Sequence, residues 1–353
     1  MPSDRAPPTE TPLRDGFIAP AEWEPHQACY MAWPCRADTW LGHLEEARAA
    51  YTEVAQAIQR FEPVIMLVSP ESLEDARRRL GHEIELQSTE IDDSWIRDNG
   101  PIFVRAQDGR LAAVQFRFNG WGGRFTPYDR DARAPEILAE RLSLPLYRAS
   151  IVAEGGALAV DGEGTVVTTE SCLLNPNRNP DRSRAEVESD LKSYLGVRKV
   201  IWLRRGMHAS QVDGHIDGIA AFARSGVILA AAANDPNDPN HAIFRENRDR
   251  LLSETDARGR PIEVIDFPSP APHFIDGHRL SATFMNFYIA NGGIVAPTFG
   301  DPADSQALES LRSIFPGREV VGVRCNYIAL GGGDVHCITQ QLPVGTPTRP
   351  HHV

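Results

Sequence analysis

Hydrophobic and polar positions along this 353-residue chain follow a pattern that recurs. Two runs rich in β-branched and aromatic residues come first, then a segment with apolar residues at helical spacing, and then another strand-like run. Short β-branched runs are typical of strands, and apolar residues three or four positions apart are typical of helices. The first copy occupies 102–105, 111–118, 135–142 and 146–151. The pattern therefore predicts a unit with the order strand, strand, helix, strand.

The same order returns three more times. The strand-like runs lie at 157–160, 165–169 and 200–203, at 219–222, 227–231 and 262–267, and at 287–290, 294–297 and 320–323. A helical segment comes before the last strand of each copy, marked by Val187, Leu191 and Tyr194, by Leu251, and by Leu308, Leu311 and Ile314. A recurring unit of this kind predicts an architecture built from copies of one module.

A fifth copy is split between the two ends of the sequence. Its strands would come from 335–341, 28–33 and 64–68, and its helix from the face with Leu44, Ala47, Tyr51, Val54 and Ile58. Ends that complete one unit would close a ring of modules. We therefore expect an α/β fold, a five-bladed α/β propeller with pseudo-fivefold strand-strand-helix-strand modules closed by the chain ends. An open α/β sheet of mixed direction is the alternative that periodicity leaves open.

Proline and glycine are scattered as turns, and no linker divides the sequence. We expect one domain at 16–343, with a flexible N-terminal segment at 1–15 and a flexible tail at 344–353. No apolar run reaches the roughly 20 residues that a membrane span needs. The start of the sequence is polar and Pro-rich, unlike a secretory signal or an Arg-rich transit peptide.

Charge and cysteine content narrow the class of protein. Lys and Arg number 36 and Asp and Glu number 48, so the formal net charge is 36 − 48 = −12. This balance disfavours a broad nucleic-acid or anionic-membrane surface, which would need clustered cations. The five cysteines include no C-x-x-C pair and do not resemble a disulfide framework. We expect a protein of the reducing cytoplasm.

Dense polar stretches lie at the ends of the predicted strands. They are 92–101 with Trp95 and Asp98, 118–123 with Trp121, 154–156 with Glu154, 213–218 with His215 and Asp217, and 331–339 with Gly332 and Cys337. Each stretch taken alone also fits an exposed or tight turn. A large aromatic among charges, however, is suited to contact a cationic ligand. The sequence has no glycine-rich nucleotide loop and no G-x-S-x-G nucleophile turn.

Among the five cysteines, Cys337 has the surroundings of a nucleophile. It follows three glycines that let the backbone approach a ligand closely, and His336 lies beside it. On an extended segment His215 and Asp217 would point the same way, a pairing suited to acid–base chemistry. A zinc site of His215, Asp217 and Cys337 is the metal alternative, but it lacks the paired His spacing of most hydrolytic zinc sites. Cys172 is expected to be structural.

These motifs, in this order, resemble those of agmatine deiminases, which belong to the bacterial peptidyl-arginine deiminase family of guanidine-modifying enzymes. The resemblance covers about 16–343 and implies the same propeller fold that the repeating unit predicts. The residues that carry it are Pro20–His26, Trp95–Asp98, Glu154–Gly156, Cys172–Asn179, Gly214–Asp217, Asn286–Gly293 and Gly331–Cys337.

The resemblance implies a site without metal or cofactor, in which a thiolate attacks a guanidinium carbon. The implied catalytic residues are Cys337 as nucleophile, His215 as general acid and base, and Glu154, which orients His215. The implied substrate-binding residues are Asp98, Asp217, Trp95, Trp121 and Gly332. The chemistry is consistent, because a planar guanidinium pairs with carboxylates through two parallel N–H groups.

We therefore expect hydrolysis of agmatine to N-carbamoylputrescine and ammonia, a step of polyamine synthesis. One segment departs from the family pattern, since 207–213 lacks the usual acidic, Thr- or Asn-containing sequence before the Gly-His pair. A deiminase for arginine, a guanidino acid or peptidyl-arginine is thus the alternative, with Arg97, Arg124 and Arg178 as candidates to bind a carboxylate. A binding protein without turnover is a second rival. A homodimer or larger homo-oligomer is the default expectation for a soluble enzyme.

Overall fold

The predicted strand, strand, helix, strand unit occurs in five separate sheets of this computed structural model, which describes residues 10–208, 210–233 and 235–347. The first unit is β5 (Ile102–Ala106), β6 (Arg110–Arg117), α5 (Ala134–Arg141) and β7 (Leu146–Val152), and the second is β8 (Ala159–Val160), β9 (Thr165–Thr169), α7 (Arg184–Leu195) and β10 (Lys199–Leu203). The third is β11 (Ala220–Arg224), β12 (Val227–Ala232), α8 (Pro239–Leu252) and β13 (Glu263–Pro268), and the fourth is β16 (Tyr288–Ala290), β17 (Gly293–Thr298), α9 (Asp304–Ile314) and β18 (Glu319–Arg324). The fold is therefore mixed α/β.

The fifth unit joins distant parts of the chain, as predicted. It consists of β19 (Thr339–Pro343), β2 (His26–Ala32), α1 (Leu44–Gln59) and β3 (Val64–Val68). In all five units the first two strands pair antiparallel, and the crossover helix then returns the chain to a parallel third strand. Shorter strands extend the sheets, namely β1 (Phe17–Ile18), β4 (Glu85–Ser88) and β20 (Thr346–Pro347), while β14 (Phe274–Ile275) and β15 (His278–Arg279) form a hairpin.

One predicted strand is shorter than expected. The sequence predicts a strand over 335–341, but β19 begins only at Thr339, and 335–338 form turns. The cause is a competing set of hydrogen bonds to Asn286. The backbone N–H of His336 donates to the Asn286 carbonyl oxygen at 3.0 Å, and that of Cys337 donates to the Asn286 side-chain oxygen at 3.1 Å. These bonds hold the chain away from β2 until Thr339.

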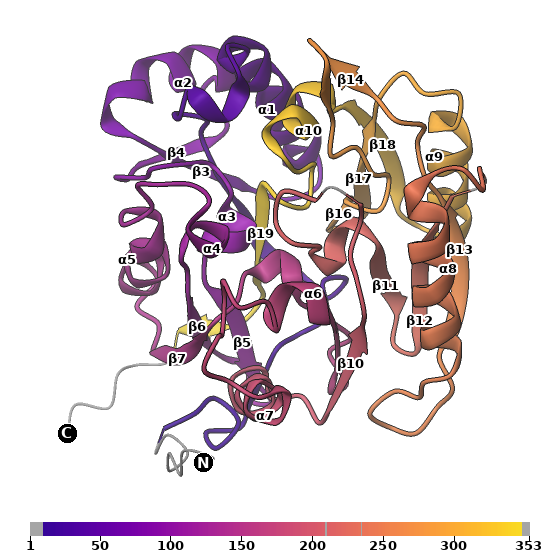
Figure 1. Cartoon of the computed structure of the whole chain (residues 1–353). Coiled ribbons are helices and arrows are strands. Elements are labelled where there is room, and N and C mark those ends of the chain that lie inside the picture. Colours follow the sequence, from indigo (N-terminus) through magenta and orange to yellow (C-terminus); the bar gives the residue numbers. More distant parts are fainter. Residues whose placement is uncertain (1–9, 209, 234, 348–353) are drawn as a thin grey trace, which may run out of the picture.

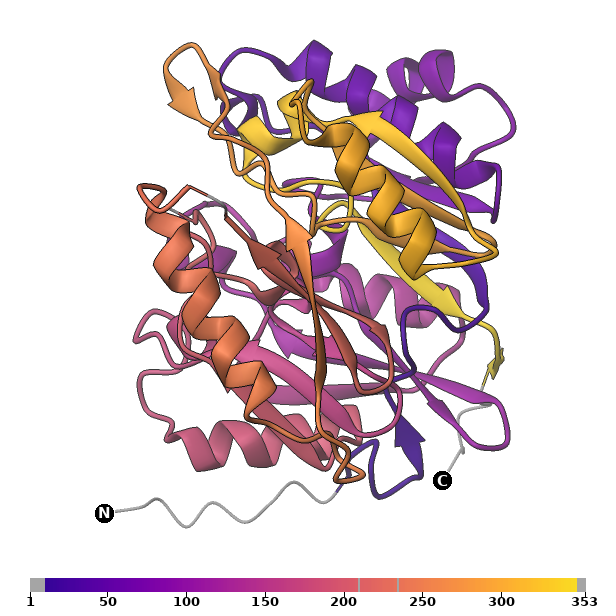
Figure 2. The ribbon, with the colours of Figure 1, turned by 90° about the vertical axis from the view of Figure 1, so that its right-hand side faces the viewer.

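The crossover helices bury an apolar face against the sheets. In α1 the buried residues Ala47, Tyr51, Val54 and Ile58 recur at helical spacing, which is the pattern that predicted the helix. Helices α7, α8, α9 and α1 also contact the last strand of the preceding unit, which is β7, β10, β13 and β18 respectively. Figure 1 shows the five crossover helices toward the periphery, and Figure 2 shows α8 and α9 on the outside of their sheets. These four helices thus pack one unit against its neighbour.

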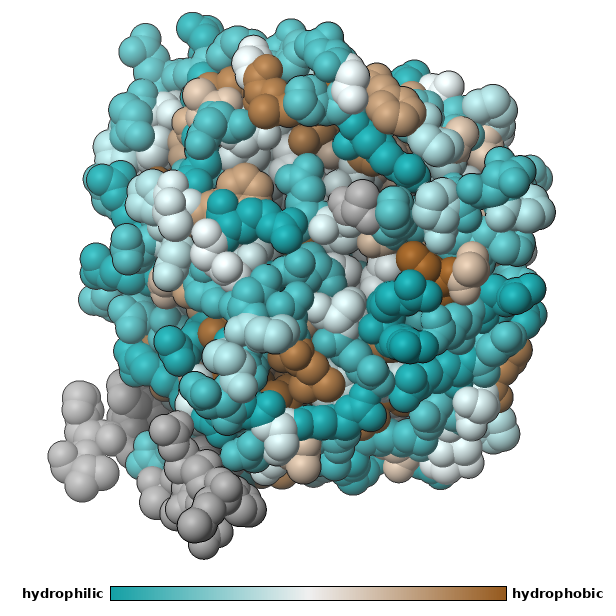
Figure 3. Space-filling model, viewed as in Figure 1, coloured by the Kyte–Doolittle hydropathy of each residue, from teal (hydrophilic) through white to brown (hydrophobic). Residues whose placement is uncertain are grey.

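Within the described part of the chain, every helix is too short or too polar to cross a membrane. The face in Figure 3 is mostly hydrophilic, with small separate hydrophobic patches. The flexible ends predicted at 1–15 and 344–353 fall partly outside the described residues. Strand β20 pairs with β6 just after the predicted boundary at 343, which itself stays a prediction.

A buried carboxyl fixes the polar loop that follows β4. The Asp131 carboxyl oxygen Oδ1 accepts hydrogen bonds from the backbone N–H groups of Asp92 at 2.8 Å and Asp93 at 3.2 Å. Burial, followed by the neighbouring carboxylate of Asp93, raises the pKa of Asp131 to about 8. This loop leads directly into the residues that carry the chemistry.

The pKa of Asp131 predicts how stability depends on pH. Because the folded state keeps this carboxyl protonated up to about pH 8 and the unfolded state releases the proton near the ordinary aspartate pKa of 3.8, the free energy of unfolding should fall as pH rises between these values. Asp131→Asn removes this effect and keeps an acceptor for both N–H groups. Its melting temperature relative to the parent should therefore rise between pH 5 and pH 8. The exposed substitution Asp108→Asn is the control, and an Asp131→Asn difference that stays constant with pH would contradict the prediction.

Candidate active site

Residues of the candidate site, some predicted and some not, lie in turns directly before the first strand of each unit. Asp98 is in α3 (Ile96–Asn99) before β5, and Gly156 is in the 3-10 turn η4 (Gly155–Ala157) before β8. Asp217 is in the 3-10 turn η5 (Ile216–Gly218) before β11, Asn286 precedes β16, and Cys337 precedes β19. The turn η4 contacts both α3 and η5. The repeated unit therefore brings together residues that are far apart in the sequence.

The Cys337 thiol lies among buried polar groups. Its Sγ donates to Asp217 Oδ2 at 3.5 Å and accepts a hydrogen bond from Asn286 Nδ2 at 3.3 Å. Burial and the carboxylates of Asp217 and Asp98 raise the thiol pKa well above its usual value. A cation bound beside these carboxylates would oppose that shift, because positive charge favours the thiolate.

His215 lies between two carboxylates. Its Nδ1 is 3.6 Å from Asp98 Oδ1, and its Nε2 is 3.6 Å from Glu154 Oε2. Burial disfavours the charged ring, but the Asp98 carboxylate, together with Cys172 and Glu154, raises the pKa of His215 well above its usual value. The ring is thus an imidazolium near neutral pH and can act as a proton donor.

The segment around His215 is not the extended strand considered from the sequence. His215 immediately precedes the 3-10 turn η5, and Asp217 lies within that turn. The chain bends at Gly214, whose φ of 91° lies in the left-handed region, and its Cα packs against Gly206. The turn still places both side chains against Gly156.

Gly156 is the point on which three side chains converge. A Cβ added there would lie 2.7 Å from Asp98 Oδ1, 2.7 Å from His215 Nδ1 and 2.8 Å from Asp217 Oδ2. Its backbone N–H donates to Asp98 Oδ1 at 3.0 Å. Only a glycine leaves room for this arrangement, which explains the residue that follows Glu154 and Gly155 in the sequence.

Two tryptophans form walls of the site. The Trp121 indole N–H donates to Asp98 Oδ2 at 2.9 Å, and Trp95 stacks on Trp40 with ring centroids 5.6 Å apart. Trp121 itself has a φ of 53°, which is unusual for a bulky residue and turns it toward the site. A Cβ on Gly333 would lie 2.7 Å from Cys337 Sγ and 2.8 Å from the Trp95 ring.

These groups line a pocket of about 380 Å³, here named the tryptophan pocket. Its lining residues are Thr39, Asp93, Trp95, Asp98, Trp121, Phe125, Gln211, Val212, His215, Gly331, Gly332 and Cys337. It thus contains six of the eight residues predicted from the sequence. Of the other two, Asp217 contacts the thiol directly, and Glu154 lies beside His215. No Lys or Arg occurs among the described residues that line it.

A second layer of charged residues was not assigned from the sequence. Arg178 Nε donates to Glu154 Oε1 at 2.7 Å, and His336 Nδ1 lies 3.0 Å from Asp217 Oδ2. Although burial alone would raise both values, His215 and Arg178 lower the pKa of Glu154, and His336 lowers that of Asp217.

Glu22 and Arg97 extend this layer of charged residues behind His336. The Nε2 of His336 lies 2.9 Å from Glu22 Oε1, and Arg97 also donates to Glu22 at 3.2 Å. The repeat could have identified Asn286, because it occupies the same place in the fourth unit as Asp98 does in the first. Nothing in the sequence pairs Glu22 with His336.

Glu154, Cys172 and His215 are the described residues that could hold a metal ion, since their ligand atoms lie within 4.8 Å of one another. Cys172, expected to be structural, therefore contacts the site, and its Sγ donates to Glu154 Oε2 at 3.7 Å. The Arg178 guanidinium already binds the other oxygen of Glu154 and would repel a cation. The set differs from the zinc alternative considered from the sequence, and we expect activity without a metal.

Comparisons with known proteins agree on one family. The sequence model of the Porphyromonas-type peptidyl-arginine deiminases matches residues 18–343. An agmatine deiminase from Pseudomonas aeruginosa is 42% identical over 360 residues, which cover 95% of this chain and 98% of that protein. The structure of an agmatine deiminase from Enterococcus faecalis matches with a TM-score of 0.91 at 36% identity, covering 95% of this chain and 98% of that one. That of an agmatine deiminase from C. jejuni with substrate bound matches with a TM-score of 0.86 at 26% identity, covering 94% and 97%.

Gly156→Ala tests the convergence of the three side chains. The added methyl group must displace Asp98, His215 or Asp217, and a displacement of about 1 Å at a reacting centre can lower the rate by about 10²-fold. We expect a loss of this size in kcat/KM for ammonia release from a guanidine, with a melting temperature close to that of the parent. Gly218→Ala is the matched control, because a Cβ there meets no atom within 4 Å. Equal activity of the two variants would contradict the prediction.

Proposed function

The chain belongs to the Porphyromonas-type peptidyl-arginine deiminase family, and we propose that this member is an agmatine deiminase, a hydrolase that converts agmatine to N-carbamoylputrescine and ammonia. The observation that carries the choice of substrate is the charge of the tryptophan pocket. Its lining includes the carboxyl groups of Asp93 and Asp98 and, among the described residues, no Lys or Arg. Agmatine is a dication with a guanidinium at one end, an ammonium at the other and no carboxylate.

Asp93 is the residue we assign to the ammonium end. Its Oδ2 accepts a hydrogen bond from Thr39 Oγ1 at 2.8 Å, and its Oδ1 accepts one from the Ser94 backbone N–H at 2.8 Å. Burial raises the pKa of Asp93 to about 6, so this carboxyl is an anion at neutral pH. The alkyl chain between the two cationic ends would contact Trp95 and Trp121, whose aromatic faces suit a methylene chain next to positive charge.

A guanidine that carries a carboxylate fits the pocket less well. Arg97 and Arg178, considered from the sequence as carboxylate partners, are buried and bind Glu22 and Glu154 instead. Arg124 donates to the backbone oxygen of Gln211 and to the Asp213 carboxylate. The unusual segment 207–213 contributes Gln211 and Val212 to the pocket, and Ala209 lies outside the described residues. We therefore rank arginine and its derivatives below agmatine, as the alternative substrates.

In the first half of the proposed reaction, Asp98 and Asp217 hold the planar guanidinium. Its positive charge lowers the pKa of the Cys337 thiol and thereby favours the thiolate. The thiolate attacks the central carbon, and the His215 imidazolium donates its proton to the departing nitrogen. Ammonia leaves, and an S-alkylthiouronium remains on Cys337.

In the second half, a water molecule replaces the ammonia. Neutral His215 removes one proton from this water, the oxygen attacks the thiouronium carbon, and the C–S bond breaks to return the Cys337 thiolate. The second proton of the water is then lost from the product to solvent, which leaves a neutral ureido group. Glu154 stabilises the imidazolium that forms, since its Oε2 lies 3.6 Å from His215 Nε2. The product keeps the carbamoyl group on the alkylamine.

The proposal also covers the fold, the cell compartment and the partners of the protein. We infer that the five units are blades of a five-bladed α/β propeller, which the shared strand order and the helix contacts between consecutive units support. The five free cysteines favour the cytoplasm. We expect a small guanidine as the partner, no binding of nucleic acid or membrane, and a homodimer or larger homo-oligomer.

Ammonia release from a panel of guanidines tests the proposed function. We expect turnover of agmatine well above that of arginine, a guanidino acid or a peptidyl-arginine, and no change on adding EDTA. Cys337→Ala should abolish release while still binding agmatine, because the carboxylates remain. Turnover of arginine without turnover of agmatine would overturn the substrate, and turnover by Cys337→Ala would overturn the thiol mechanism.

Asp93→Asn tests the assignment of the ammonium end. A hydrogen bond between charged groups contributes about 1.5–3 kcal/mol, so the KM for agmatine should rise about tenfold or more. The KM for butylguanidine, which lacks the amine, should change little. Asp92→Asn alters the adjacent carboxylate, which is not among the described lining residues, and serves as the control. An equal change for both substrates would contradict the assignment.

A further inference from the structure

A second cavity meets the tryptophan pocket at the nucleophile. It has a volume of about 360 Å³ and is here named the polar chamber. The two cavities share Val212, His215, Gly332 and Cys337. Their other walls differ in chemistry. The tryptophan pocket continues along aromatic side chains, whereas the polar chamber is lined by Ser210, Ser281, Thr283, Asn286 and Asp334, among others.

The proposed reaction needs two routes to Cys337. After the first half, the substrate remains attached to Sγ, and its alkyl chain still occupies the tryptophan pocket. Ammonia must leave and a water molecule must arrive while that chain stays in place. The walls of the tryptophan pocket are mostly buried, so a bound chain closes this route. Its half-buried lining residues are Phe125, Gln211, Val212 and Gly332.

The polar chamber has an acceptor suited to water and to ammonia. The Asp334 side chain is fully buried, its Oδ2 accepts the Thr283 backbone N–H at 3.2 Å, and its Oδ1 has no partner among the described residues. A buried carboxyl oxygen without a partner is costly, and a water molecule is the usual remedy. Asn286, which donates to Cys337 Sγ, lines the same chamber. Polar groups therefore extend from the chamber wall to the thiol.

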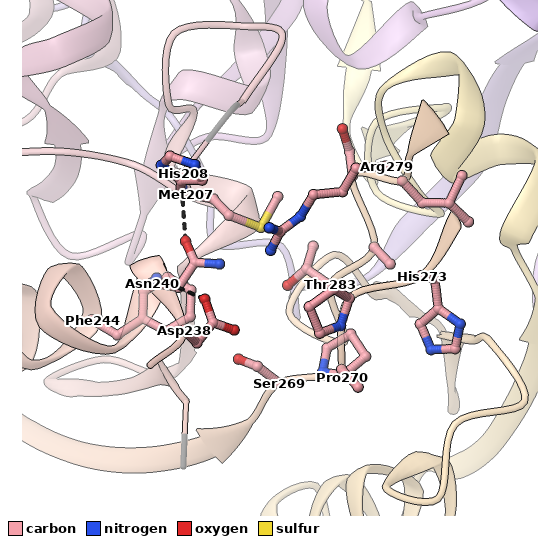
Figure 4. A pocket seen from close by; sticks show the side chains of 15 residues that line it. Met207, His208, Asp238, Asn240, Phe244, Ser269, Pro270, His273, Arg279 and Thr283 are labelled. Carbon is pink, nitrogen blue, oxygen red and sulfur yellow. Dashed lines mark hydrogen bonds between the residues drawn. The ribbon is translucent and has the colours of Figure 1, made fainter. Parts of the chain in front are cut away.

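A larger cavity borders the polar chamber on the side toward the surface. This outer pocket, of about 590 Å³, shares Met207, Ser281 and Thr283 with the polar chamber. Figure 4 shows Met207 and Arg279 pointing toward each other across it, with Thr283 beside them. His208 and Ala271 in its lining are exposed, so the outer pocket reaches solvent.

We propose that the polar chamber and the outer pocket form a port through which ammonia leaves and the hydrolytic water enters, while the alkyl chain of the substrate fills the tryptophan pocket. The proposal rests on the deiminase function proposed above. In the first half the C–N bond breaks, and the nitrogen leaves through the port as ammonia with the proton from His215. In the second half the water oxygen bonds to the carbon, one of its protons returns to His215 and the other passes to solvent, and the electron pair of the C–S bond returns to sulfur.

A graded series at Ser281 tests the port, because this residue lines both of its cavities. Ser281→Ala keeps the port open, Ser281→Val narrows it, and Ser281→Leu fills it. We expect kcat for agmatine to fall with side-chain size, by about tenfold in the Leu variant. KM should not rise. The adduct of Cys337, with the mass of agmatine minus ammonia, should accumulate in the intact-protein mass spectrum, and exchange of isotopically labelled ammonium into agmatine should fall.

The outcomes separate the port from the function. If the parent protein releases no ammonia from any guanidine, both proposals are overturned. An unchanged kcat in a folded Ser281→Leu variant would overturn the port alone, as would a raised KM without accumulation of the adduct. Melting temperatures show whether each variant is folded. If the Leu variant unfolds, kcat and the adduct are compared between the Val variant and the parent.

Discussion

The site depends on burying several carboxylates, away from water, beside the Cys337 thiol. An uncompensated buried charge costs several kcal/mol, whereas a buried carboxylate with a cationic partner and hydrogen bonds can remain ionised. The pairs are Asp98 with His215, Glu154 with His215 and Arg178, and Asp217 with His336. His336 is held in turn by Glu22, which also binds Arg97. Negative charge therefore faces the cavity, and the compensating cations lie mostly behind it.

This arrangement follows from the repeated unit. Each first strand enters its sheet from a turn, and in each of the five units that turn carries a polar or nucleophilic group of the site, with glycines where backbone and side chains must approach closely. The strands and crossover helices supply rigidity, since their apolar faces are buried within and between units. The turns thus carry the polar residues of the site, and the sheets stabilise the fold. Repeated folds commonly show this division.

Local patterns predicted much of this from the sequence. The strands and crossover helices were predicted within a few residues because each buries an apolar face with a clear period. The motifs identified Asp98, Glu154, His215, Asp217 and Cys337, and the structure brings all five together.

Local patterns in the sequence could not predict contacts between residues that lie far apart along the chain. The true start of β19 depends on hydrogen bonds that the backbone of His336 and Cys337 donates to Asn286, which is 51 residues from Cys337. Arg178 resembles an exposed loop cation in the sequence, yet the fold buries it against Glu154. Cys172 was predicted to be structural because it lies in a run of mixed polar and apolar residues, whereas its neighbours in space are Glu154 and His215.

The pairing of β2 with β19 also sets an order on folding during synthesis. Thr339 pairs with Met31, so the two strands are 339 − 31 = 308 residues apart along the chain. While the ribosome makes the intervening units, one edge of β2 has no partner, and Cys337 does not yet exist. Contacts between such distant residues form late, because closing a long loop costs more entropy. A nascent chain can therefore fold its middle sheets early, whereas Cys337 is made only just before β19, the strand that completes the fifth unit.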